Sequence, residues 1–106
     1  MDSEYNAYTV TIQNTATDML LAHARFLAQV SEATAERLVR EFVSKAKTLE
    51  YMPERCPWLL GDAIPRYKYR KLIFEKHYML VYQIVADKVY VDAMLDCRQD
   101  YDWLLR

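Results

Sequence analysis

The sequence predicts an α+β domain in which an antiparallel helical hairpin packs on a small twisted sheet. Apolar residues recur at helical spacing through residues 15–49, and apolar and polar residues alternate through three segments of residues 67–95. A shorter alternating segment at residues 8–12 adds an N-terminal strand before the helices. The chain has 106 residues, which is enough for one core but not for two, so we expect a single domain over residues 1–106.

The first half of the chain is expected to hold the N-terminal strand and the helical hairpin. The strand lies at residues 8–12, where YTVTI is rich in β-forming residues. Thr15 opens the segment TATD, a pattern typical of a helix cap, and the first helix follows it. Ser31 interrupts the helical spacing and is expected to cap a second helix over residues 32–49. Pro53 ends that helix, and the short connection predicts that the two helices are antiparallel.

The second half is expected to form a three-stranded antiparallel meander. All three prolines and the only glycine fall in residues 53–65, which indicates a loop between the helices and the sheet. The strands are predicted at Tyr67–Phe74, Tyr78–Val85 and Val89–Leu95. We expect a short C-terminal helical turn over Asp100–Arg106.

Composition excludes several classes of protein. The chain is 53% hydrophobic and 27% charged, as is usual for a globular domain. No apolar run reaches the roughly 18 residues of a membrane span, and the acidic N-terminus does not resemble a signal peptide, so we expect a cytoplasmic protein with no membrane partner. Cys56 and Cys97 are far apart and are expected to be free thiols. They have no metal-ligand spacing with His23 or His77, so we expect neither a metal nor a cofactor.

Positive charge is clustered just before and along the first strand of the meander. Residues 66–77 hold five cations and one acid, Glu75, although the net charge of the whole chain is −1. Arg66, Lys68 and Arg70 are two residues apart and are expected to share one face of that strand. This cluster is a candidate surface for phosphate or RNA, formed by Arg66, Lys68, Lys71 and Lys76 around Arg70. The alternative is a solvated edge strand whose cations prevent aggregation.

The order of elements and several motifs resemble the RelE/ParE superfamily of toxins from type II toxin–antitoxin systems, which includes plasmid stabilisation proteins. The likeness covers about residues 5–104. Its motifs are Tyr69-Arg70-Lys71, the strand Tyr78–Ile84, Lys88-Val89-Tyr90-Val91 and Cys97-Arg98-Gln99-Asp100-Tyr101. Members of the superfamily include ribosome-dependent mRNA endonucleases (mRNA interferases) and ParE-like gyrase poisons. The resemblance therefore implies a toxin with a cognate antitoxin protein as partner and with mRNA on the ribosome or, alternatively, DNA gyrase as target.

Metal-independent RNA cleavage needs a base, a cation that stabilises the phosphorane and an acid. Arg70 is the first candidate for the cation because guanidinium is always charged and binds phosphate with two bonds. Arg98, Asp100 and Tyr101 form a second candidate cluster, since the corresponding segment of YoeB-like toxins runs Arg-x-His-Tyr. Asp100 stands at the histidine position, and His77 is a candidate proton carrier. The alternatives are a structural Arg98–Asp100 pair and an ordinary surface histidine.

One position departs from the pattern of the nucleases. RelE-like and YoeB-like enzymes carry an arginine early in the central strand, where this chain has Met79. Three hypotheses follow: an mRNA endonuclease as the leading one, a ParE-like gyrase inhibitor as the alternative, and a catalytically inactive antitoxin-binding module. The catalytic hypothesis requires that the cations near Arg70 and the segment 98–101 converge on one concavity. The antitoxin is expected to cover Arg66–Lys76 and the helical hairpin with acidic and aliphatic residues.

Overall fold

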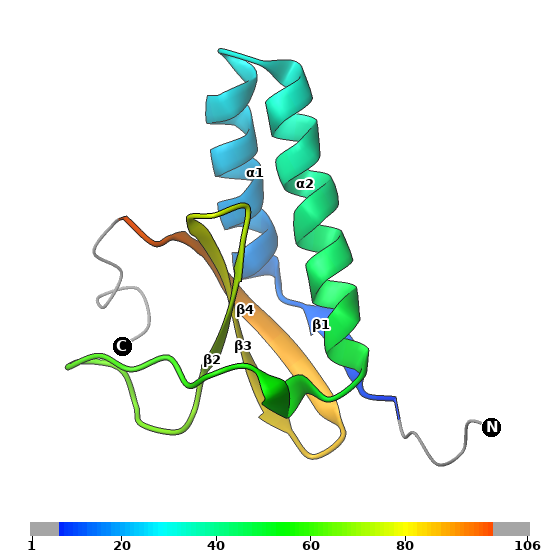
Figure 1. Ribbon diagram of the computed structural model, residues 1–106, viewed down its shortest axis with the longest axis vertical. Coiled ribbons are helices and arrows are strands. Elements are labelled where there is room, and N and C mark those ends of the chain that lie inside the picture. The colour runs from blue at the N-terminus through cyan, green and yellow to red at the C-terminus, as the bar shows by residue number, and fades with distance from the viewer. Residues whose placement is uncertain (1–6, 99–106) are drawn as a thin grey trace.

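The computed structural model describes residues 7–98, in which a helical hairpin packs on one face of a four-stranded sheet (Figure 1). This is the α+β class that the sequence predicts. The elements are β1 (Thr9–Ile12), α1 (Asn14–Ala28), α2 (Glu32–Lys47), the 3-10 turns Thr48–Glu50 and Pro53–Arg55, β2 (Arg70–Phe74), β3 (Tyr78–Val85) and β4 (Lys88–Asp96). The predicted turn at Asp100–Arg106 lies outside the described residues. Within those residues, no helix is both long and apolar enough to cross a membrane.

The sheet has the strand order β1-β4-β3-β2. Strands β2, β3 and β4 pair antiparallel in sequence order, which confirms the predicted meander. Strand β1 pairs parallel with β4, with Thr9 opposite Lys88 and Ile12 opposite Val91. The sheet is therefore mixed, and β1 and β2 form its two edges.

The two predicted helix caps have different outcomes. Ser31 caps α2 as expected, because its Oγ accepts a hydrogen bond of 3.2 Å from the backbone N–H of Thr34. The prediction for Thr15 is wrong: α1 begins at Asn14 with Gln13 at the N-cap position, and the Thr15 hydroxyl donates to the carbonyl oxygen of Asp92 at 2.8 Å. Asp92 is the extra residue of a β-bulge, since Val81 pairs with Ala93 and Tyr82 pairs with Val91. The bulge leaves that carbonyl without a partner in the neighbouring strand.

The sheet is covered on both faces, so β3 has five consecutive buried residues, Tyr78–Tyr82. The helices cover one face, where Phe42 and Leu38 pack with Leu80 and Tyr82. The loop between α2 and β2 covers part of the other face, where Leu59 and Ile64 pack with residues of β3 and β4. A strand buried on both faces does not show a simple alternation of burial. Both cysteines are free, as expected.

Strand β2 is shorter than predicted. It begins at Arg70, whereas the sequence pattern placed its start at Tyr67. Residues 66–68 form a turn in which Tyr67 has a positive φ of 59°. The expectation that Arg66, Lys68 and Arg70 share one strand face is therefore wrong, because an extended strand alternates its side chains only where the backbone is extended.

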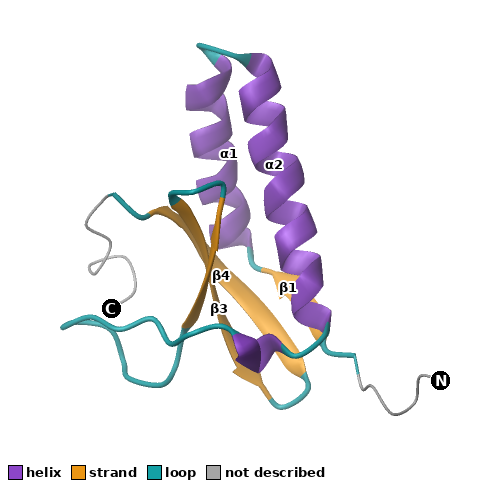
Figure 2. Ribbon diagram, in the orientation of Figure 1, coloured by secondary structure: helices purple, strands orange, loops and turns teal. Residues whose placement is uncertain are grey.

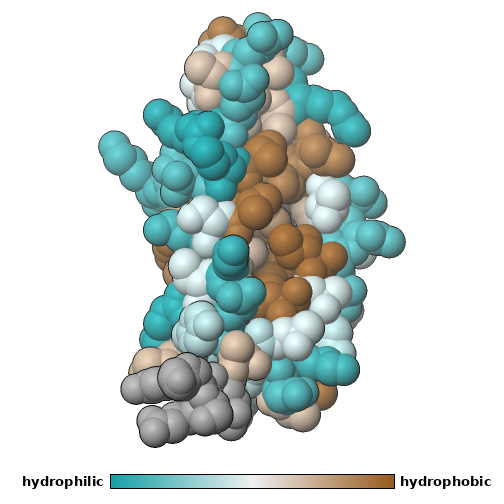
Figure 3. All heavy atoms as spheres, turned by 90° about the vertical axis from the view of Figure 1, so that its right-hand side faces the viewer, coloured by the Kyte–Doolittle hydropathy of each residue, from teal (hydrophilic) through white to brown (hydrophobic). Residues whose placement is uncertain are grey.

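The helical hairpin extends well past the ends of the strands (Figure 2). Its far part therefore has surfaces that the sheet does not cover. One of them is a groove of about 460 Å³ between α1 and α2, whose apolar lining residues are Leu21, Ala24, Ala28, Ala35 and Val39. A space-filling view from the side of α2 shows hydrophobic side chains gathered in a continuous patch (Figure 3).

Candidate functional site

A second and larger groove lies between the helical hairpin and the turn that joins β2 to β3. Its volume is about 1050 Å³. Its polar lining comes from four places: α1, α2, the β2–β3 turn with the first residue of β3, and the end of β4. The polar lining residues are His23, Thr34, Arg37, Glu75, Lys76, His77, Tyr78, Asp96 and Arg98. We call this the hairpin–turn groove.

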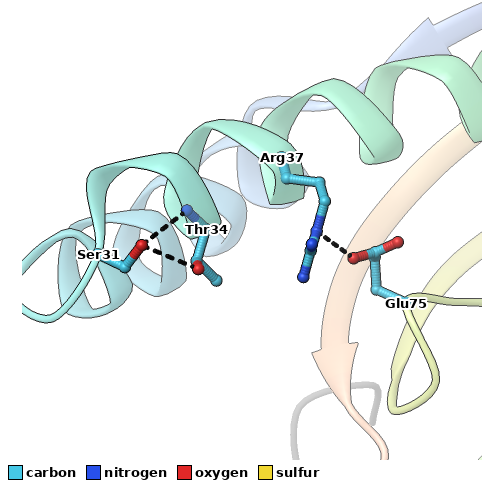
Figure 4. A network of polar contacts seen from close by, with 4 residues as sticks. All are labelled: Ser31, Thr34, Arg37 and Glu75. Carbon is cyan, nitrogen blue, oxygen red and sulfur yellow. Dashed lines mark hydrogen bonds and ion pairs between the residues drawn. The ribbon is translucent and has the colours of Figure 1, made fainter.

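An ion pair attaches the β2–β3 turn to the hairpin. Arg37 Nε donates to Glu75 Oε1 at 2.9 Å (Figure 4), and both residues line the groove. Both Glu75 and Lys76 have positive φ values, 45° and 72°, in this tight turn. The backbone therefore reverses without a glycine, and the turn presents Glu75 toward α2.

Arg98 and Asp96 form the strongest charged contact of the groove. Arg98 donates from Nε to Asp96 Oδ1 at 3.0 Å and from Nη2 to Oδ2 at 2.7 Å, and the Arg98 backbone N–H donates to Oδ1 at 2.9 Å. These bonds lower the pKa of Asp96 to about 2, chiefly through the side chain of Arg98. Asp96 is thus ionised at neutral pH and compensates the charge of Arg98. The predicted alternative paired Arg98 with Asp100, which lies outside the described residues; within them Arg98 pairs with Asp96.

Two histidines contact the ring of Tyr78. The His77 centroid is 4.4 Å from that of Tyr78, and the His23 ring meets Tyr78 edge-on at 5.6 Å. Burial lowers the pKa of His23; the charge of Asp96 partly opposes this shift, and the nearby His77 adds to it. Burial also raises the pKa of the Tyr78 hydroxyl. The groove thus brings proton-carrying groups from α1 and β3 together.

Arg70 does not line the hairpin–turn groove. It begins β2, whereas the groove lies beyond the other end of that strand, about 13 Å away for five extended residues. Its Nη1 donates to the carbonyl oxygens of Glu54 at 3.0 Å and Cys56 at 2.7 Å, and its guanidinium stacks on the Trp58 ring at 3.8 Å. Arg70 therefore holds the 53–58 segment against the sheet.

The structure thus brings together part of the predicted site. Arg98, His77 and Lys76 line one groove, while Arg70 lies elsewhere with its own partners. Asp100 and Tyr101 lie outside the described residues. The remaining predicted phosphate ligands are the exposed Arg66 and Lys68 in the turn before β2 and the half-buried Lys71 on β2.

Sequence reasoning missed His23, Arg37, Tyr78 and Asp96 as groove residues. Asp96 carried a usable signal, because an acid only two residues before Arg98 is close enough in the chain to pair with it. Arg37 carried none, since its partner Glu75 is 38 residues away. Across residues 7–98, no group of three or more histidine, cysteine or acidic side chains is arranged to hold a metal ion.

Comparisons with known proteins agree on one kind of protein. The family model described as the ParE toxin of the type II toxin–antitoxin system parDE matches residues 10–101. A solved structure titled as the chromosomal ParDE system from P. aeruginosa has a chain that superposes with a TM-score of 0.69 at 12% sequence identity. The match covers 86% of this chain and 97% of that one, and at this identity it shows a common fold. No curated protein matches the sequence significantly.

Proposed function

This chain belongs to the ParE toxin family of type II toxin–antitoxin systems, and from that premise we propose that it arrests growth by inhibiting DNA gyrase. Within the RelE/ParE superfamily, gyrase is the target of the ParE-like branch. Members of the same superfamily share a scaffold but differ in their targets, so the choice of target has to rest on particular residues.

The burial of Met79 is the observation that carries the choice of gyrase. Met79 is 2% exposed and packs in the cluster that contains Leu59 and Ile64. The nuclease members have an arginine at this position. In this chain the loop side chains shield Met79 from solvent, so the position is not accessible to a substrate. Arg70, the other candidate cation, donates to backbone carbonyls. Both features support a toxin that does not cut RNA.

The hairpin–turn groove favours mRNA cleavage as a second candidate function. His77, Tyr78 and Arg98 line it together, and they supply two proton carriers and one cation. In that mechanism His77 would accept the 2′-hydroxyl proton, Arg98 would stabilise the phosphorane and Tyr78 would protonate the leaving 5′-oxygen. Asp96 weakens this candidate because it already neutralises Arg98.

Two assays separate the candidates. We expect the purified chain to inhibit supercoiling by gyrase or to trap its cleavage complex. In cells in which the chain is induced, we expect primer extension to show intact messages. Cleaved messages with unaffected gyrase would replace the gyrase proposal by the nuclease. Normal growth on induction, with gyrase and messages both unaffected, would indicate an inactive binding module.

A toxin–antitoxin system implies a cognate antitoxin, and we propose that it docks on the apolar groove of the helical hairpin. Arg25 and Arg40 flank this groove, beside the single acid Glu36. An amphipathic helix with aliphatic residues toward the groove and acidic residues at its border fits this surface. The basic turn with Arg66 and Lys68 is a second expected contact.

The small acidic protein expected to be encoded beside this gene is the partner to use. Leu21→Asp places a charge in the groove at a side chain that is 38% exposed, and we expect it to weaken the complex at least tenfold. Val85→Asp, on an exposed residue at the end of β3, is the control and should leave binding unchanged. Equal binding by Leu21→Asp would exclude the groove. The reversal Arg66→Glu/Lys68→Glu tests the second contact.

A further inference from the structure

The loop that leads into β2 carries an exposed tyrosine between two exposed cations, and a half-buried tryptophan contacts that tyrosine. The Nζ of Lys68 lies 5.2 Å from the centroid of the Tyr69 ring. The rings of Trp58 and Tyr67 meet edge to face, with centroids 5.7 Å apart and planes at 72°. Arg66 and Lys68 lie on either side of Tyr67 in the chain, and both are exposed. We call Trp58, Arg66, Tyr67 and Lys68 the aromatic–cationic loop surface. The segment between the second 3-10 turn and β2 makes a long excursion beside the sheet (Figure 1), while Leu59 and Ile64 within it are buried against the strands.

The backbone at Tyr67 is strained in a way that presents its ring to solvent. Its φ of 59° lies in the left-handed region, which glycine or asparagine occupies readily and a bulky aromatic residue rarely does. The side chain is nevertheless 65% exposed, so burial in the core does not offset the strain. Strained residues of this kind gather at binding sites, where the surrounding structure maintains them.

Trp58 is held rigidly from behind. The Arg70 guanidinium stacks on its ring at 3.8 Å and is itself fixed by the carbonyl oxygens of Glu54 and Cys56. Trp58 also forms an isolated antiparallel bridge with Arg70. The ring that supports Tyr67 therefore keeps its place, and little side-chain freedom remains to be lost when a ligand binds.

The local charge differs from that of the whole chain. Residues 58–71 carry one acid, Asp62, and the four cations Arg66, Lys68, Arg70 and Lys71, whereas the net charge of the chain is −1. Cations on either side of an exposed, preorganised aromatic ring suit a ligand that alternates phosphates with flat bases.

We propose that the aromatic–cationic loop surface binds a single strand of nucleic acid, with one base stacked on Tyr67 and the adjoining phosphates contacted by Arg66 and Lys68. Stacking on an aromatic ring tolerates every base, so the surface reads shape and charge and not sequence. The inference stands apart from the toxin's target, because binding is measured directly on the purified chain without gyrase or ribosomes.

Fluorescence anisotropy with a labelled eight-nucleotide oligothymidine, its RNA equivalent oligouridine and a DNA duplex tests the proposal. We expect both single strands to bind and the duplex to bind more weakly, because its bases are already stacked. Preference for oligothymidine or oligouridine tells whether the natural strand is DNA or RNA. Tyr67→Asn removes the ring at a residue type that accepts the left-handed backbone, and we expect about tenfold weaker binding.

The charges are tested separately. Arg66→Gln/Lys68→Gln removes two cations from exposed positions, and the slope of log affinity against log salt should fall by about 1.4. Matched controls are Tyr51→Asn, an exposed ring outside the surface, and Arg40→Gln/Lys47→Gln, two exposed cations of α2. Both controls should bind like the unaltered chain, and circular dichroism establishes that every variant is folded.

Three results would overturn the proposal. The first is no binding of either single strand at low salt. The second is that folded Tyr67→Asn binds with unchanged affinity while Arg66→Gln/Lys68→Gln binds more weakly. That result would mean that the surface binds any polyanion through charge alone. The third is that all loop variants bind oligonucleotide with unchanged affinity while Tyr67→Asn no longer inhibits gyrase. That result would mean that the surface contacts a protein and not a nucleic acid.

Discussion

Arg37 and Glu75 join the second helix to the β2–β3 turn through one ion pair, with Nε 2.9 Å from Oε1. The two residues are 38 positions apart in the chain, and the turn that carries Glu75 has two consecutive residues with positive φ. Both residues line the hairpin–turn groove. The pair ties the turn that precedes His77 to α2.

Removal of this ion pair should loosen the turn and have little effect on global stability. Both side chains are partly exposed, so Glu75→Gln should lower the free energy of unfolding by less than about 1 kcal/mol. Amide exchange at residues 75–77 should become faster, because the turn loses its tie to α2. Glu36→Gln, on an exposed residue of the same helix, is the control. Unchanged exchange in Glu75→Gln would show that the pair does not restrain the turn.

The Arg98–Asp96 pair should make stability depend on acid pH. The pKa of Asp96 is about 2 in the folded chain against an ordinary 3.8, so its stabilisation is complete above about pH 4 and is lost as the pH falls toward 2. Asp96→Asn should cost ~1 kcal/mol at neutral pH, a modest value because Arg98 is well exposed.

Urea denaturation from pH 7 to pH 2.5 measures this effect. The difference between the unaltered chain and Asp96→Asn should shrink as the solution becomes more acidic, while Asp62→Asn, on an exposed loop residue, should show no such trend. A difference that stays constant over the whole range would mean that Asp96 is not held ionised by Arg98.

Met79 and Ile73 face each other across β3 and β2 and allow a matched comparison. Met79→Arg buries a charge in an apolar cluster and should lower the free energy of unfolding by about 3 kcal/mol or more. Ile73→Arg, on a side chain that is 46% exposed, should cost less than about 1 kcal/mol. Thermal denaturation measures both. A stable Met79→Arg chain that cleaves mRNA would contradict the assignment of this position to the core.

Arg70 should act as a structural clamp that lysine cannot replace. Arg70→Lys keeps the charge but loses the planar stack on Trp58 and the paired bonds to two carbonyls, and it should cost about 2 kcal/mol. Trp58 fluorescence in a Trp103→Phe background should report a more solvated ring. Lys71→Arg, the adjacent position, is the control. If Arg70→Lys were as stable as the unaltered chain, the structural role of Arg70 would be excluded, and the predicted binding of phosphate by Arg70 would be the better hypothesis.

The N-cap of α2 should contribute measurably to stability. Ser31→Ala removes the acceptor for the Thr34 N–H and should lower the free energy of unfolding by about 1 kcal/mol. Ser44→Ala, at an exposed position in the last turn of the same helix, should be neutral or slightly stabilising because alanine has the higher helix propensity. Equal stability of the two variants in urea would show that the cap is dispensable.

The elements of the fold were predictable wherever a local pattern decided them. Helical spacing placed the hairpin, Ser31 marked its turn, and alternation gave the bounds of β3 at Tyr78–Val85. The start of β2 was not predictable in this way. The alternation of residues 67–74 continues back through Tyr67, but the backbone turns there, because the loop residues Trp58 and Leu59 bond to the chain at Arg70 and Tyr69.

The residues of the candidate site were likewise predictable only where a local pattern identified them. The sequence singled out Arg98, His77 and Lys76, which do line one groove, but it joined them to Arg70, which contacts a segment 14 to 16 residues earlier. The local TATD pattern assigned Thr15 to a helix cap, whereas a bulge in β4 offers that hydroxyl a partner 77 residues away. Such partners depend on which segments the folded chain brings together.

By itself the sequence determined the class of fold, the meander, the free thiols and the toxin superfamily, because periodicity and short motifs act over a few neighbouring residues. Tertiary structure alone decided that Met79 is buried, that Asp96 neutralises Arg98, and that Arg70 holds a loop in place. Those outcomes depend on which polar and apolar groups come into contact once water is excluded. Such contacts join residues that are distant in the chain, so a local sequence pattern does not predict them.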